Sequence, residues 1–295
     1  MLKFHPPGFE QKSIKTSLGR MVYYTQNGQH WKIDNIEKLP PLLFLHNFGG
    51  GASAFEWSKV YPAFANKYRI LAPDLIGWGD SAHLIQNYQI EDYLNTISEF
   101  IQRSCDQPVT VVASSLTAAF MVRLAISQPD LFTALYLVSP SGFDDFDQGS
   151  GRRLPLPLIN TPFLDDLIYG LGAENEIAVR NFLESFLFGK PERLTQEIVD
   201  AYLTSAQKPN AKFAALSFLK GDLYFDLSLY ISQLQVPTVF FWGESAQFTN
   251  VDLGKRLASL NKSVIRDFQV IPETGILPHL EIPGFFIGLL SQYLN

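Results

Sequence analysis

The chain has 295 residues, of which 46% are hydrophobic and 18% are charged. This length predicts one large hydrophobic core rather than two independent domains joined by a linker. The net charge is −6, and no run of Lys or Arg could neutralise a phosphate backbone, so nucleic acid is not an expected partner. The single cysteine, Cys105, excludes an internal disulfide and a multi-cysteine metal site.

Neither a secretory signal nor a membrane span is predicted. The first eight residues contain two prolines and no apolar stretch of the kind that a signal peptide needs. Uninterrupted apolar residues nowhere approach the roughly 20 that cross a bilayer. We therefore expect a cytoplasmic protein without a transmembrane segment, and we expect no cofactor.

Apolar runs of strand length alternate with helical patterns along the chain. The first of these, Ser13–Gln26, predicts an antiparallel hairpin. Continuous apolarity, typical of parallel strands that are covered on both faces, marks six later runs: Pro41–Phe48, Tyr68–Asp74, Val109–Ser114, Ala134–Ser139, Pro237–Trp242 and Ile265–Ile271. Helical patterns lie between or after them, at Ser53–Phe64, Gln89–Cys105, Leu116–Gln128, Asn250–Leu260 and Phe285–Leu294. The alternation predicts an α/β fold, with a mostly parallel twisted sheet and helices on both faces.

Residues 143–229 interrupt this alternation. They contain no convincing buried strand, only polar turns and amphipathic helical pieces such as Glu176–Phe188 and Thr195–Ala206. An insertion of this size is too long for a loop. We therefore predict a helical cap, or lid, inserted after the sixth strand, over the strand ends where ligands bind in such sheets. Residues 1–142 and 230–295 would form the core domain.

Ser115 lies where a predicted strand passes directly into a helix, in the segment V-T-V-V-A-S-S-L-T-A-A at residues 109–119. This segment resembles the nucleophile elbow of the α/β-hydrolase superfamily, G-x-S-x-G, and the resemblance implies that Ser115 holds the place of the catalytic serine. The flanking glycines are replaced by Ala113 and Thr117. Ala113 should fit the close approach of strand and helix, whereas the β-branched Thr117 is expected to widen the turn.

Two further segments agree with this resemblance in order and spacing. The segment H-N-F-G-G-G at residues 46–51 resembles the family's H-G-x-G loop, with Asn47 in place of a glycine. The resemblance implies an oxyanion hole made by the backbone N–H groups of Phe48 and Leu116. The segment A-P-D-L-I-G-W-G-D-S at residues 72–81 closely resembles the P-D-x-x-G-x-G-x-S turn, whose role is mainly structural.

The other two triad positions depart from the family. After the seventh strand the family reads W-G-x-x-D, and this chain has W-G-E-S-A, which puts Ala246 at the acid position. After the eighth strand the family often reads G-H-x-P-x-x-E-x-P. This chain has G-I-L-P-H-L-E-I-P there, which puts Ile276 at the base position. A serine hydroxyl is a poor nucleophile without a positioned base. Losing the histidine of such a triad costs roughly 10⁶ in turnover and leaves on the order of 10³–10⁴ over water.

Other titratable groups lie near enough in the sequence pattern to be candidates for the missing base or acid. His46, on the oxyanion loop, could act as a relocated base, although a hydrogen-bonded loop anchor is favoured for it. His279 is expected to cap or pack against a helix, and His83 is expected to be solvated. Asp144 and Asp145 are expected to cap a turn where the cap begins. Glu281 matches the element that anchors the last helix.

Three hypotheses follow. The preferred one is a lidded pocket at Ser115 with weak or absent triad hydrolysis, which binds a small apolar molecule. Its expected lining comprises Asn47, Ser114, Phe143, Phe248 and Ile276, together with Phe48, Trp78, Phe163 and Tyr169. The alternative is an active serine hydrolase that uses Ser115 and His46 on an ester-type small molecule. The third is an interaction module with a vestigial elbow, which would carry an exposed apolar patch in place of a pocket. No metal is expected in any of them.

Overall fold

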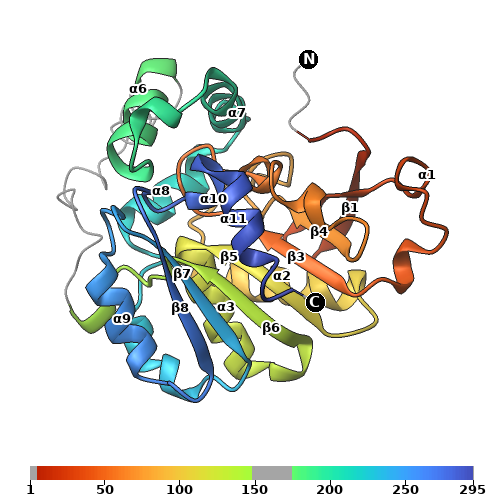
Figure 1. The fold of residues 1–295 in the computed structure, drawn as a ribbon. Coiled ribbons are helices and arrows are strands. Elements are labelled where there is room, and N and C mark those ends of the chain that lie inside the picture. Colours follow the sequence, from red (N-terminus) through yellow and green to blue (C-terminus); the bar gives the residue numbers. More distant parts are fainter. Residues whose placement is uncertain (1–4, 148–174, 295) are drawn as a thin grey trace.

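The computed structural model describes residues 5–147 and 175–294. Its centre is an eight-stranded sheet with the strand order β1-β2-β4-β3-β5-β6-β7-β8 (Figure 1). The hairpin of β1 and β2 is antiparallel, β2 pairs antiparallel with β4, and all other neighbours are parallel. The strands are β1 (Phe9–Thr16), β2 (Gly19–Gln26), β3 (Pro41–Leu45), β4 (Arg69–Pro73), β5 (Val109–Ser114), β6 (Phe132–Val138), β7 (Thr238–Gly243) and β8 (Ile265–Ile271). The predicted fold class is confirmed.

Alternate side chains of each central strand feed two separate hydrophobic cores, as expected when both faces of a sheet are covered. In β3, Leu43 and Leu45 belong to one core and Leu42 and Phe44 to the other. The first core is closed by α2 (Ile90–Ser104), α3 (Ser115–Ser127) and α9 (Val251–Ser259). The second is closed by α11 (Pro283–Leu290) and by the residues after β3. Two shorter helices are α1 (Gly28–Trp31) and α10 (Pro278–Glu281).

The helix predicted for Ser53–Phe64 was wrong. The structure has two 3₁₀ turns there, Ala54–Trp57 and Tyr61–Phe64. Pro62 explains the break, because proline has no N–H for an α-helical bond and its ring clashes with the carbonyl four residues earlier. All four residues of the first turn are buried, so this segment is packed on every side rather than along one stripe.

In the segment predicted to form a cap, the structure has α6 (Glu176–Phe182), a π-helical turn (Leu183–Leu187), α7 (Gln196–Ala206) and α8 (Lys212–Lys220). The helix α8 was not predicted. Figure 1 shows α6 and α7 at one side of the molecule, with α8 between them and the sheet. Phe163 and Tyr169 lie outside the described residues.

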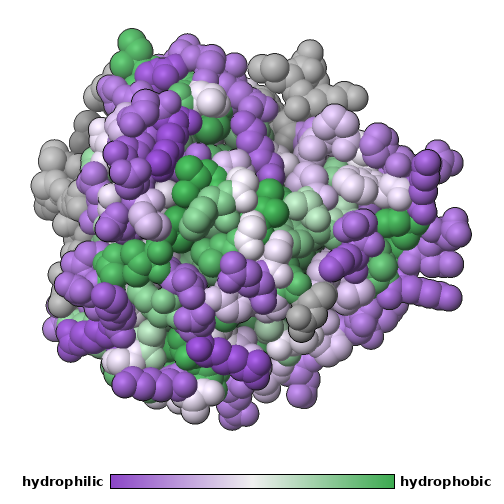
Figure 2. Space-filling model, in the orientation of Figure 1, coloured by the Kyte–Doolittle hydropathy of each residue, from purple (hydrophilic) through white to green (hydrophobic). Residues whose placement is uncertain are grey.

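The face of the molecule shown in Figure 2 carries many polar side chains. Figure 2 shows apolar side chains that reach the surface over α10 and α11, where Phe285 is 55% exposed. Within the described parts of the chain, no helix combines the length and the apolarity that a membrane span needs.

Candidate functional site

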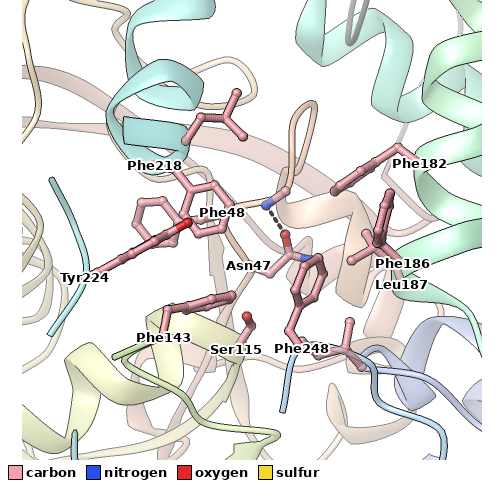
Figure 3. A pocket seen from close by; sticks show the side chains of 13 residues that line it. Asn47, Phe48, Ser115, Phe143, Phe182, Phe186, Leu187, Phe218, Tyr224 and Phe248 are labelled. Carbon is pink, nitrogen blue, oxygen red and sulfur yellow. Dashed lines mark hydrogen bonds between the residues drawn. The ribbon is translucent and has the colours of Figure 1, made fainter. Parts of the chain in front are cut away.

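Ser115 occupies a sharp turn between β5 and α3. Its backbone has φ of 55°, in the left-handed region that a non-glycine residue adopts at a cost of about 1–2 kcal/mol. The side chain of Ser115 faces a cavity of about 310 Å³ (Figure 3). Its hydroxyl makes no hydrogen bond to any described residue. The strained conformation of a nucleophile elbow is therefore retained.

Thr117 stands at one of the elbow's two glycine positions. The residue is fully buried, and its hydroxyl donates a hydrogen bond of 2.6 Å to the carbonyl oxygen of His46. A glycine at this position would have no such donor. Thr117 therefore ties the first turn of α3 to the oxyanion loop, and its effect on the width of the elbow stays a prediction.

The oxyanion loop is held by its own polar groups. The side-chain oxygen of Asn47 accepts a short hydrogen bond from the N–H of Gly49, and the N–H of Asn47 donates to Glu56 at 3.1 Å. By contrast, the N–H groups of Phe48 and Leu116 make no hydrogen bond to any other residue that the structure describes. Both of the predicted oxyanion-hole donors are therefore free to bind an acceptor.

His46 is a loop anchor in this structure. Its Nε2 accepts a hydrogen bond of 3.0 Å from the N–H of Leu75, so Nδ1 must carry the proton that is donated to the carbonyl of Asn47 at 2.7 Å. The ring is fully buried, and burial lowers the pKa of His46. Both nitrogens are committed to the backbone, which leaves none to take a proton from Ser115.

This arrangement predicts that His46 makes the protein less stable in acid. Because the folded-state pKa lies below 6.5, the unfolded chain takes up the proton first, and the free energy of unfolding falls as pH decreases below about 6.5. The fall is at most about 1.4 kcal/mol per pH unit. His46→Gln keeps an acceptor for Leu75 but has no proton to titrate. Urea denaturation between pH 8 and pH 5.5 should therefore show a shallower fall for the variant.

The comparison with His46→Gln is needed because the titration of another buried group, Asp74, changes the free energy of unfolding in the opposite direction as pH falls. Burial raises the pKa of Asp74 to about 7, so its contribution to stability increases as pH falls from 7 towards 4. The difference between wild type and variant cancels that contribution. Equal slopes in the two proteins would show that His46 does not titrate with unfolding.

A buried glutamate that the sequence analysis missed lies beneath the cavity. Glu56 is 1% exposed, and its carboxylate accepts from the hydroxyl of Ser114 at 2.5 Å, from Nε2 of His279 at 2.8 Å and from the N–H of Asn47. His279 also stacks on Trp57, with ring centroids 3.6 Å apart. Glu56 therefore joins the elbow, the oxyanion loop and α10.

This network corrects the expectation for Ser114. Ser114 does not line the cavity, because its hydroxyl bonds to Glu56. His279 is a fully buried partner of that carboxylate and packs against Phe286 of α11, with ring centroids 5.6 Å apart, so of its two expected roles packing against a helix is confirmed. The expectation of a solvated His83 was also wrong, since its Nε2 bonds to the carbonyl of Gly79 at 3.0 Å. None of the five histidines of the chain, all of which the structure describes, hydrogen-bonds to Ser115.

The two substituted triad positions lie in different surroundings. Ile276, at the base position, lines the same cavity as Ser115 and is 2% exposed, and its N–H donates to the carbonyl of Leu187 at 3.0 Å. Ala246, at the acid position, is buried on the loop after β7 and does not line the cavity. The base position therefore presents hydrocarbon to the serine.

Two other carboxylates, Asp145 and Glu281, connect separate segments of the fold. Asp145 accepts from the hydroxyl of Ser141 at 2.7 Å and from the N–H of Leu227 at 2.9 Å, so it fixes the start of the cap, and burial raises its pKa. Glu281 accepts from the N–H groups of Gly189 and Gly275 at 3.0 and 2.5 Å, which ties α10 to the cap.

Asp74 organises the turn after β4. It accepts from the N–H groups of Ala54 and Asp80 at 2.7 and 2.8 Å. Gly79 must be glycine, because its φ is +53° and a Cβ would lie 2.2 Å from the Asp74 carboxyl carbon.

The cavity is apolar and largely aromatic. Among the described residues it is lined by Asn47, Phe48, Gly49, Ser115, Phe143, Phe182, Phe186, Leu187, Phe218, Leu219, Tyr224, Phe248 and Ile276. No charged side chain is among them. Figure 3 shows the rings arranged around Ser115 and Asn47. Trp78 is not part of this lining: it packs against Phe48, with ring centroids 5.5 Å apart, and donates to the hydroxyl of Tyr93. The aromatic residues of α6, the π-helical turn and α8 were not predicted individually.

The eight-stranded sheet, the elbow at Ser115 and the oxyanion loop together define an α/β-hydrolase fold. The chain belongs to the Alpha/beta hydrolase family, whose sequence model matches residues 42–287.

Relatives of known name are distant and differ in chemistry. The chain is 26% identical to Lipase 1 of Psychrobacter immobilis, over 92% of this chain and 80% of that protein. It is 23% identical to 2-hydroxy-6-oxo-6-(2'-aminophenyl)hexa-2,4-dienoic acid hydrolase of Metapseudomonas resinovorans, over 86% and 84%. Similar solved structures include the serine hydrolase CarC involved in carbazole degradation (TM-score 0.76, 18% identity, covering 97% and 98%). An epoxide hydrolase, CorEH, is also similar (TM-score 0.74, 19% identity, 96% and 98%). At these identities the structures establish the fold alone.

Proposed function

We propose that this protein binds a small apolar molecule in the cavity beside Ser115 and performs little or no triad hydrolysis. The proposal rests mainly on one observation: Ser115 and Ile276 line the same cavity, and Ile276 stands at the position where the family has its catalytic base. Isoleucine has no group that could accept the serine proton or orient a base.

The alternative of a relocated base receives no support from His46. A general base must lie within hydrogen-bond reach of the proton that it removes. His46 uses Nε2 and Nδ1 for two backbone partners, and it is not among the residues that line the cavity. Protonation of Nε2 would also cost the hydrogen bond from Leu75. A hydrolase acting through Ser115 and His46 would need this loop to rebuild.

The cavity supports a binding function rather than an interaction module with a vestigial elbow. At about 310 Å³ it is at the lower end of the range for small-molecule pockets, and its walls are the hydrophobic and aromatic surfaces that such pockets use. The third hypothesis expected an exposed apolar patch in place of a pocket. The open volume next to Ser115 speaks against it. The named relatives include lipases and a dienoic acid hydrolase, so an ester or related acyl compound is the substrate class if hydrolysis occurs.

A fluorophosphonate probe tests the catalytic half of the proposal. We expect labelling of the wild-type protein to be no faster than labelling of Ser115→Ala, because the hydroxyl is not activated. Intact mass measured over several hours would follow the adduct. Ser115-dependent labelling on the timescale of minutes, matched by turnover of a p-nitrophenyl ester, would replace the proposal with an active serine hydrolase.

The binding half is tested with a neutral apolar molecule, 3-phenyl-1-propanol, by isothermal titration calorimetry. We expect saturable one-site binding to the wild type and its loss in Ile276→Trp, whose larger side chain would occupy the cavity. Binding that is unchanged in Ile276→Trp would place the ligand elsewhere and contradict the proposal.

A further inference from the structure

Aromatic rings make up most of the wall of the cavity. Seven of the 13 described residues that line it are Phe or Tyr, whereas aromatic residues make up 14% of the whole chain. Only three of the lining residues are aliphatic: Leu187, Leu219 and Ile276. A core that needs only hydrocarbon uses Leu, Ile and Val as readily as Phe. The excess of rings therefore distinguishes this cavity from an ordinary hydrophobic core.

The rings that keep part of their surface accessible come from five separate segments. These are α6, the π-helical turn, α8, the residues after α8 and the loop after β7, which supply Phe182, Phe186, Phe218, Tyr224 and Phe248. Figure 3 shows Tyr224 on one side of Ser115, and Phe182 and Phe186 on the other. A stripe of rings along one helix would be ordinary core packing, but here rings from several elements converge on one open space.

The rings form two groups that meet at Phe143. In the first group, Phe218 and Tyr224 lie against Phe143, with ring centroids 5.4 and 5.2 Å away and interplanar angles of 87° and 16°. In the second group, Phe186 stacks on Phe248 at 5.7 Å. Phe143 lies 5.9 Å from Phe248 and so connects the two groups. Aromatic rings attract one another at these separations, both offset-stacked and edge-to-face. The wall is therefore a continuous aromatic surface that presents faces as well as edges of rings.

The backbone of Phe143 is strained where it supports this wall. Its φ is 68°, in the left-handed region that bulky residues other than glycine rarely adopt. Its N–H donates to the hydroxyl of Ser141 at 3.0 Å, and that hydroxyl donates to Asp145 at 2.7 Å. Residues held in strained conformations cluster at ligand-binding sites, where the surrounding fold fixes them. Because Phe143 is only 2% exposed, it positions the more accessible rings around it.

An aromatic ring on a ligand would use this wall better than an aliphatic group. A ring can stack on one wall residue and meet the edge of another, and such ring pairs are stabilised beyond the burial of their area. A flexible chain gains only the burial and loses rotational freedom when it binds.

A cation can also lie over the face of a ring, but two features of this cavity disfavour one. No carboxylate is among the described residues that line it. In addition, Ser115 begins α3, a helix of 13 residues, and the N-terminus of a helix carries the positive end of its dipole. The favoured ligand is therefore a neutral aromatic compound.

We propose that the molecule bound in the cavity carries an aromatic ring, which lies between Phe186 and Phe248 on one side and Tyr224 on the other. This inference rests on the proposed binding function and narrows its ligand class from apolar to aromatic. A volume of about 310 Å³, at roughly 30 Å³ for each water-sized group, holds about ten non-hydrogen atoms. This size corresponds to one ring with a short side chain, as in 3-phenyl-1-propanol.

The test compares 3-phenyl-1-propanol with its saturated counterpart, 3-cyclohexyl-1-propanol, by isothermal titration calorimetry. The two compounds share a carbon skeleton and a hydroxyl, and the saturated ring is thicker, so it has more apolar surface to bury. A cavity without a preference for aromatic rings would therefore bind the cyclohexyl compound at least as tightly. For the wild type we expect the phenyl compound to bind about three- to tenfold more tightly, because its ring gains contacts with the rings of the wall.

The variant Phe248→Leu removes one ring of the wall but keeps a hydrocarbon side chain. We expect the preference for the phenyl compound to fall to within about twofold, while the affinity for the cyclohexyl compound stays within about threefold of the wild type. The matched control is Phe285→Leu, since Phe285 is 55% exposed on α11 and does not line the cavity. It should leave both affinities unchanged.

The outcomes separate the two proposals. If the cyclohexyl compound binds to the wild type as tightly as the phenyl compound, or more tightly, the aromatic assignment is overturned and the proposed apolar binding stands. If neither compound binds, both proposals are overturned. This comparison does not depend on any variant. A preference for the phenyl compound that is unchanged in both Phe186→Leu and Phe248→Leu, with thermal unfolding showing both to be folded, would mean that these rings do not contact the ligand and would also overturn the assignment.

Discussion

Replacing Ile276 with histidine and Ala246 with aspartate together should raise Ser115-dependent ester hydrolysis by at least about 100-fold over the wild type. A positioned general base contributes typically 10²–10⁴ in rate. The other parts of the catalytic arrangement are already present: the left-handed backbone at Ser115, the free N–H groups of Phe48 and Leu116, and a cavity that both Ser115 and Ile276 line. Hydrolysis of p-nitrophenyl butyrate, with a Ser115→Ala version of the double variant as the blank, measures the gain.

The single variants show which position limits activity. Ala246→Asp alone should stay at the wild-type rate, because a carboxylate without a histidine has nothing to orient. Ile276→His alone should give only part of the gain, because the ring lacks the partner that fixes its tautomer. The bond from the N–H of Ile276 to the carbonyl of Leu187 involves only backbone atoms and should survive the substitution. A folded double variant without increased hydrolysis would show that the loops after β7 and β8 no longer converge on Ser115.

The elements of the core could be predicted because their signals are local. Each buried strand can be recognised from a continuous run of apolar residues. The P-D-x-x-G-x-G turn is fixed by contacts between residues close in sequence, such as Asp74 and Gly79. The position of Ser115 follows from the passage of β5 into α3. These features depend on neighbours in the sequence, so the sequence is sufficient to find them.

The polar network beneath the cavity could not be predicted in the same way. Glu56 and His279 are separated by 223 positions, and nothing in the sequence near either residue indicates the other. Glu56 lay in a segment with a helical pattern, where a glutamate is ordinarily on the solvated face. The neighbours Ser114 and Ser115 are alike in sequence, yet one bonds to Glu56 and the other faces the cavity. Because the backbone of Ser115 is left-handed, the two side chains point in different directions. Only the folded structure shows that Ser115 is the one that faces the cavity.

The substitution Glu56→Ala is expected to have the largest effect on stability, a loss of about 3–5 kcal/mol in the free energy of unfolding. Removing one member of a buried ionic or hydrogen-bonded pair leaves its partner without compensation. Here three donors would be left: the hydroxyl of Ser114, Nε2 of His279 and the N–H of Asn47. Urea denaturation at pH 7.5 measures the loss.

A surface glutamate provides the matched control. Glu197 pairs with Lys59 at 2.7 Å, but its side chain is 57% exposed, so Glu197→Ala should change stability by no more than about 0.5 kcal/mol. Glu56→Gln should be intermediate, because the amide oxygen can accept from one or two of the three donors while its NH₂ group faces another donor. The order expected for the loss is therefore Glu56→Ala, then Glu56→Gln, then Glu197→Ala. A Glu56→Ala protein as stable as Glu197→Ala would mean that water replaces the carboxylate, and Glu56 would then not be what holds the elbow, the oxyanion loop and α10 together.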